Sequence, residues 1–119
     1  MAKNPKNDTV EYTLTILAAT AGGTSNAQDL GPNRLWAIQM PAAWTAAALT
    51  FLASSDGVTY APVYIDGAEY SVTVGVSQFV VIGSNLIGAQ FVQLRSGTAS
   101  TPVQQGADRT MKLVCLAKL

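Results

Sequence analysis

The stretch that decides the fold runs from Thr9 to Thr20 and reads TVEYTLTILAAT. Apolar and polar side chains alternate along it: one face carries Val10, Tyr12, Leu14 and Ile16, and the other carries Thr9, Glu11, Thr13 and Thr15. A period of two residues is that of a β-strand with one face buried and the other in solvent. This stretch therefore predicts a half-buried strand.

Further segments of the chain have the length and composition of strands. They are Leu35 to Met40, Leu49 to Ser54, Tyr60 to Ile65, Glu69 to Val76, Gln78 to Ile82, Phe91 to Ser96 and Arg109 to Leu119. Asp56-Gly57 and Asp66-Gly67 are turn signals, and Leu86 to Ala89 has room for one helical turn. About eight short antiparallel strands with frequent turns predict an all-β protein, a jelly-roll-like β-sandwich. We expect residues 9–119 to form this single domain and residues 1–8 to form a flexible amino-terminal arm.

The composition excludes several kinds of chemistry. The chain has 119 residues, no histidine and one cysteine. Catalytic triads that need histidine, zinc sites of the HExxH or Cys2His2 type and disulfides within the chain are therefore excluded. We expect no enzymatic activity, no metal and no cofactor. We also expect Cys115 to be a small buried hydrophobic residue.

Charge and hydropathy also limit the partners. Seven basic residues balance seven acidic ones, and the basic residues are scattered along the chain, which argues against nucleic-acid binding. No run of about 18 apolar residues exists, so no membrane-spanning helix is expected. The first residues, MAKNPKNDTV, lack the apolar core of a signal peptide, and we expect the product to stay where it is made.

Low charge favours self-association. Only 12% of the residues are charged, and several strands have two apolar faces, although a sandwich needs only one. In the last strand, the face opposite Met111 and Cys115 carries lysines at its ends and apolar residues at its centre. In 35–40, Trp36 shares a face with Ile38, and Leu35 lies on the other. The candidate residues for a subunit interface are Leu35, Trp36, Val114 and Leu116. Loops or the amino-terminal arm are the alternative cover for these faces.

The polar and aromatic residues offer few candidate sites. Asp56 and Asp66 precede glycines, where an aspartate caps its own turn. The candidates for stacking on a sugar ring are Trp44, Tyr60 and Tyr64. Trp44 lies in the loop PAAWTAAA, and the favoured alternative is that it plugs an open end of the sandwich. Arg95 and Arg109 flank a long polar loop and have an expected structural role, either pairing with Asp108 or bracing the loop's carbonyl groups.

Two runs resemble small structural proteins of tailed bacteriophages: MPAAWTAAALTFLASSDGVTYAPVY (40–64) and QFVQLRSGTASTPVQQGADRTMKLV (90–114). They share a proline–tryptophan–threonine loop, an "LTF…S.DG..Y" hairpin, an "LRSGT" strand end and an Arg-Thr pair before the last strand. The resemblance covers roughly residues 35–116. It implies a virion protein made in the bacterial cytoplasm, most simply a head decoration or cement protein. The implied partners are other copies, with a trimer as the leading candidate, and the major capsid protein or another virion protein.

Two further expectations accompany this resemblance. In the arm, Lys3, Asn4 and Lys6 are the candidate capsid contacts, ordering on a neighbouring subunit. The alternative function is a carbohydrate-binding module of a phage head or tail fibre. A looser similarity to discoidin-type jelly rolls, which bind sugars or lipids, points the same way. Those domains carry aromatic or basic residues at their loop tips, whereas the tips here are mostly Ala, Gly, Thr and Ser.

Overall fold

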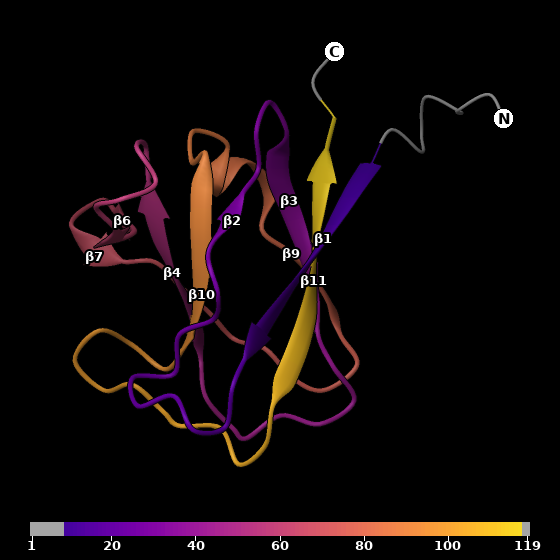
Figure 1. Cartoon of the computed structure of the whole chain (residues 1–119), viewed down its shortest axis with the longest axis vertical. Coiled ribbons are helices and arrows are strands. Elements are labelled where there is room, and N and C mark those ends of the chain that lie inside the picture. The colour runs from indigo at the N-terminus through magenta and orange to yellow at the C-terminus, as the bar shows by residue number, and fades with distance from the viewer. Residues whose placement is uncertain (1–8, 118–119) are drawn as a thin grey trace, which may run out of the picture.

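The computed structural model describes residues 9–117, which form two packed antiparallel sheets (Figure 1). Sheet A contains, in spatial order, β1 (Thr9–Ile16), β11 (Arg109–Leu116), β3 (Arg34–Gln39) and β9 (Phe79–Val81). Sheet B contains β2 (Gln28–Asp29), β10 (Phe91–Ser96), β4 (Leu49–Ser54) and β5 (Ala61–Pro62), and β8 (Ser71–Val72) also pairs with β4. A separate hairpin is made of β6 (Tyr64–Ile65) and β7 (Ala68–Glu69).

The strand order is that of a jelly roll. Along the chain, β1, β3, β9 and β11 join sheet A, whereas β2, β4, β5 and β10 join sheet B. The first and last strands lie side by side, as do β2 and β10, so each strand early in the chain pairs with one late in the chain. The predicted all-β, jelly-roll-like sandwich is confirmed.

The core lies between the two sheets. Sheet A contributes Leu14, Ile16, Ile38, Met111 and Leu113, and sheet B contributes Leu49, Phe51, Val92 and Leu94, all fully buried. The ring of Tyr70 stacks on Phe51 with centroids 5.7 Å apart and closes one side of this core. Cys115 is also buried there, as its apolar surroundings in the sequence predict.

Several element boundaries differ from the predicted ones. The first strand ends at Ile16 because a turn follows, in which the Thr20 N–H donates to the Leu17 carbonyl over 3.0 Å. The short polar strand β2 lies in a segment predicted to be a loop. The predicted strands 60–65 and 69–76 are each divided in two, and the predicted helical turn is a 3-10 turn at Gly83–Leu86. The Asp66-Gly67 turn closes the β6–β7 hairpin with φ angles of 53° and 81°, as its sequence predicts.

Candidate functional site

The most unusual surface of the molecule is the outer face of sheet A, which is turned away from sheet B. Three large apolar side chains are exposed there: Trp36 at 37%, Phe79 at 56% and Val81 at 60%. The strand register places Val81 beside Ala37, and Phe79 beside Gln39, so these side chains lie on neighbouring strands. Together with the half-buried Leu116 we call them the apolar patch. Clustered apolar residues on a surface mark contact sites more often than scattered ones do.

A β-bulge explains why Trp36 belongs to this patch. Val114 lies opposite Ala37 while Cys115 lies opposite Leu35, so Trp36 is an extra residue in β3. A bulge shifts the alternation of a strand by one residue. Leu35 therefore turns into the core, where it is fully buried, and its prediction as an interface residue is wrong. Strict alternation in the sequence cannot reveal this shift.

The last strand needs a similar correction. Val114 lies on the outer face, but it is only 8% exposed because β11 is a central strand, flanked by β1 and β3. It offers little surface to a second molecule, so the prediction of Val114 as an interface residue is also wrong. Of the predicted interface residues, Trp36 and Leu116 keep exposed surface. Phe79 and Val81 were not among the predicted interface residues, because their short apolar run predicts a buried strand.

Charges on this face are few. Lys112 Nζ lies 3.9 Å from Glu11 Oε1, and both side chains are more than half exposed. Because their charges are opposite, the pair adds no net charge close to the patch, although each exposed side chain keeps its own charge. Arg34 lies opposite Leu116 at the end of the face, and its Nε is buried without a hydrogen-bond partner in the part of the chain that the structure describes.

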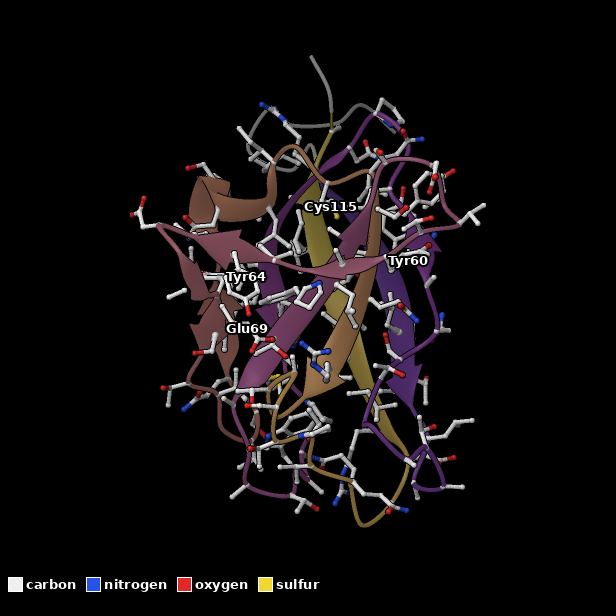
Figure 2. The ribbon with its side chains drawn as sticks, turned by 90° about the vertical axis from the view of Figure 1, so that its left-hand side faces the viewer. Tyr60, Tyr64, Glu69 and Cys115 are labelled. Carbon is white, nitrogen blue, oxygen red and sulfur yellow. The ribbon has the colours of Figure 1, made fainter. Side chains whose placement is uncertain are left out.

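The candidate sugar-stacking residues do not form one site. Trp44 is half-buried against the core, and its Nε1 donates to the Ala47 carbonyl over 3.1 Å, which is the geometry of an end plug. Tyr64 is 59% exposed, whereas Tyr60 is half-buried, and the two lie apart on the side of the molecule shown in Figure 2. None of the three lines either of the two clefts described next.

Two clefts lie beside β4 and beside the segment that follows β1. One, of about 310 Å³, lies between the end of β4 and the segment after the 3-10 turn. Its lining consists of uncharged and mostly small residues: Ala53, Ser54, Ser55, Val63, Asn85, Leu86, Gly88 and Ala89. The other, of about 480 Å³, is lined by Thr15, Leu17, Thr20, Thr24, Ser25 and Asn26. Neither contains an acid or a base, so neither offers general acid–base chemistry.

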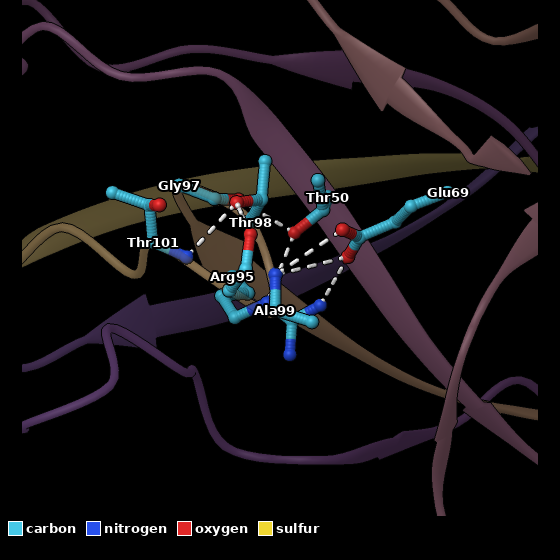
Figure 3. A network of polar contacts seen from close by, with 8 residues as sticks. Thr50, Glu69, Arg95, Gly97, Thr98, Ala99 and Thr101 are labelled. Carbon is cyan, nitrogen blue, oxygen red and sulfur yellow. Dashed lines mark hydrogen bonds and ion pairs between the residues drawn. The ribbon is translucent and has the colours of Figure 1, made fainter.

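Arg95 is the centre of a buried polar network (Figure 3). Its guanidinium forms an ion pair with Glu69, and its Nε donates to Thr50 Oγ1 over 3.1 Å. Thr50 Oγ1 in turn donates to the Gly97 carbonyl over 2.7 Å, and the Glu69 carboxylate accepts the N–H of Ala99 at 3.2 Å. The network ties the β6–β7 hairpin and the loop after β10 to sheet B.

The expected pairing of Arg95 or Arg109 with Asp108 is wrong. Asp108 accepts the backbone N–H of Ala18 over 2.9 Å, and Arg109 donates instead to Gln105 Oε1 at 3.1 Å and Thr45 Oγ1 at 3.3 Å. Gln105 is buried and bonds both the N–H and the carbonyl of Thr45. Arg109 thus braces the loop that carries Trp44, which is a structural use of the charge.

Two titratable groups have shifted pKa values. Backbone N–H groups of Thr59 and Val58, with the Ser54 hydroxyl, lower the pKa of Asp56 from 3.8 to about 2. Asp56 therefore caps its own turn, as its position before Gly57 predicts. Burial raises the pKa of the Cys115 thiol from 9.0 to about 11, so the reactive thiolate is scarce near neutral pH.

Residues 9–117 contain no cluster of three or more His, Cys, Asp or Glu side chains able to hold a metal ion. Within the same range, no helix is long and apolar enough to cross a membrane. Lys3, Asn4 and Lys6 lie outside the described residues. No protein-family model, curated protein or solved structure matches the chain.

Proposed function

We propose that this chain is a bacteriophage virion structural protein, a capsid decoration or cement protein. It stabilises the head by binding the capsid lattice through the outer face of sheet A and by contacting neighbouring copies. The observation that carries the proposal is the apolar patch of Trp36, Phe79, Val81 and Leu116 on a sheet face whose nearby charges cancel. The resemblance of 40–64 and 90–114 to phage structural proteins supports a phage head as the surface that the patch binds.

Adhesion of this kind needs little area on each copy. Burying apolar surface contributes about 25 cal/mol per Å². A contact worth only a few kcal/mol on one copy becomes substantial when many copies bind one lattice and hold adjacent capsomers together, because each bound copy raises the effective concentration of the others. The outward pressure of packaged DNA is then opposed by the sum of these contacts.

The test is an add-back experiment on phage heads that lack the protein. Purified chain is mixed with the heads, and we expect it to co-sediment with them and to raise the temperature at which they release DNA. Trp36→Ala should weaken co-sedimentation at least several-fold, because it removes the largest apolar side chain of the patch. Val58→Ala is the matched control, since Val58 is 83% exposed in a turn outside the patch.

Both variants are first checked for a wild-type circular dichroism spectrum and melting temperature. If the folded Trp36→Ala protein binds heads as well as wild type does, the patch is not the attachment face. If the wild-type chain does not bind heads at all, the proposed function is wrong.

The carbohydrate-binding alternative has less support from the described residues. Sugar-binding sites present aromatic faces at a cleft, whereas Trp44 bonds its own loop and neither Tyr60 nor Tyr64 lines either of the two clefts described above. Tyr64 is the best remaining stacking candidate because it is exposed. Retention of the wild-type chain on a glycan array, lost in Tyr64→Ala, would favour this alternative.

A further inference from the structure

The free edge of β9 carries unpaired backbone groups at two residues. β9 is the last strand of sheet A and pairs only with β3. On either side of it, the Met40 N–H donates to the Gln78 carbonyl and the Ile82 N–H donates to the Trp36 carbonyl, each over 2.8 Å. Hydrogen-bonded pairs alternate with non-bonded pairs in an antiparallel ladder. The backbone groups of Phe79 and Val81 therefore point away from β3.

These groups have no hydrogen-bond partner within residues 9–117. The side chains of the same two residues are the exposed apolar ones of the patch. Edge strands are normally protected by charged residues, prolines or bulges. Here the sequence from Tyr70 to Leu94 contains no Asp, Glu, Lys, Arg or Pro. The edge is thus open and apolar, and the protection that remains is the short length of β9, three residues.

We propose that β9 pairs antiparallel with β9 of a second copy, about a twofold axis that passes beside Val80. This inference rests on the proposed function, in which copies bind side by side on a capsid. It deepens that function by naming the contact between neighbouring copies. Phe79 then lies opposite the partner's Val81, and Val81 lies opposite the partner's Phe79. All the free N–H and carbonyl groups of both residues are satisfied in this single register.

The strand's own side chains favour a second copy as the occupant. The two opposed pairs are aromatic with β-branched, which is a favourable cross-strand combination. No charged residue of either copy lies on the paired strands, so no charge repulsion between them opposes the pairing. The outer faces of the two A sheets also become continuous, because Phe79 and Val81 aim their side chains to that face in both copies.

The other edge of sheet A does not suit self-pairing. At β1, the Thr15 N–H and carbonyl bond Asn26 at 2.8 and 3.4 Å, which shows that the odd-numbered residues face the open edge. The residues left open are Thr9, Glu11 and Thr13. A twofold pairing that uses all three places Glu11 opposite the partner's Glu11, and like charges in opposed positions destabilise a sheet.

The contact is short, so it is weak in dilute solution. β9 spans three residues, far less than a standard interface of about 800 Å² on each partner requires. Binding to a common lattice would hold copies close together and raise the effective concentration of the edges. We therefore expect reversible pairing that is visible only at high protein concentration.

The first test is light scattering on the full chain over a dilution series, from about 1 µM to about 1 mM. The wild-type mass should rise from one copy towards two. Val81→Lys should remain a single copy at every concentration, because it places a charge at the paired edge. Val58→Lys, the same change at an exposed turn, should behave as wild type.

Three results would overturn the pairing: a wild-type chain that stays a single copy at about 1 mM, a Val81→Lys variant that associates as wild type does, or a mass that rises to three copies. The last result would instead agree with the trimer expected from the sequence resemblance.

The second test traps the contact itself. Val80 lies opposite the partner's Val80 in a non-hydrogen-bonded pair, where Cα atoms are about 4.5 Å apart and within disulfide range. Val80→Cys should form disulfide-linked pairs in oxidised glutathione at least several-fold faster than Val58→Cys does. Native Cys115 is buried and adds no background. Equal rates would count against the pairing.

The two proposals fail separately. A wild-type chain that binds heads but stays a single copy at about 1 mM removes the pairing and keeps the virion function. A chain that pairs through β9 but never binds heads keeps the inference and removes the virion function.

Discussion

At the scale of single residues, Trp44 shows how one side chain closes the sandwich. It packs against the core, and its indole N–H is used by its own loop. Trp44→Ala should lower the free energy of unfolding by about 3 kcal/mol, at the low end for a large-to-small change because the ring is half-buried. Urea denaturation measures this. A change below about 1 kcal/mol, together with lost glycan retention, would contradict the plug and favour sugar binding.

Asp56 gives a prediction on pH. Hydrogen bonds from Thr59, Val58 and Ser54 hold its pKa near 2, below the ordinary 3.8. A lowered pKa means that the ionised carboxylate stabilises the fold above the ordinary pKa, and that this contribution is lost as the pH falls through about 2. Asp56→Asn should therefore melt below wild type at neutral pH, and the difference should shrink between pH 4 and pH 2.

Thermal melts of both proteins across that range measure the effect, and a carbon-13 NMR titration of the Asp56 carboxyl reads the pKa directly. A gap in melting temperature that is constant down to pH 2 would contradict the role of the ionised form.

At the scale of elements, the chain contains two ion pairs of opposite character. Arg95 is buried, Glu69 is mostly buried and the pair joins three segments, whereas Lys112 and Glu11 are exposed on one sheet. Breaking a buried pair leaves a charge without its partner, but exposed pairs contribute little. Glu69→Gln should lower the free energy of unfolding by about 3 kcal/mol, and the matched control Glu11→Gln by less than about 1 kcal/mol.

Chemical denaturation of the two variants gives the comparison. Limited proteolysis should also cut Glu69→Gln first in the loop after β10, because a neutral amide accepts the Ala99 N–H more weakly than the carboxylate does. Equal stabilities of the two variants would mean that the network does not hold the hairpin and the loop.

Strands in which apolar and polar residues alternate, or which turn residues bound, were predictable from the sequence. The bounds of β4 and β10 agree with the prediction residue for residue, and the Asp66-Gly67 turn fixes its hairpin. The strand β2 was not predictable, because Gln28 and Asp29 form a strand only by pairing with a distant β10. Pairing between residues far apart in the sequence cannot be predicted from the composition of a short segment.

The candidate site was predictable only in part. Low charge and two-sided apolar strands pointed to the outer face of sheet A and to Trp36. The bulge that buries Leu35 and the edge position that exposes Phe79 and Val81 are properties of the register and of the strand order. An apolar run such as FVV has the same composition in the middle of a sheet as at its edge.

At the scale of the whole molecule, the amino-terminal arm is expected to serve attachment rather than folding. Deleting residues 1–8 removes Lys3 and Lys6 but no residue of the hydrophobic core. The melting temperature should therefore stay within about 2 °C of wild type, while co-sedimentation with heads should weaken. Unfolding on deletion would show that the arm belongs to the domain.

The difference between the two edges of sheet A decides how far an assembly through β9 can grow. Joining β9 to β9 uses both apolar edges at once and leaves a charged β1 at each end, so the pair is complete and no third copy can add to it. A head-to-tail join of β1 to β9 would leave one open edge of each kind after every step, and such a contact makes filaments. Twofold pairing would thus let a protein of zero net charge accumulate to high concentration without forming fibres. Glu11 would be the residue that prevents a further copy from adding at the β1 edge.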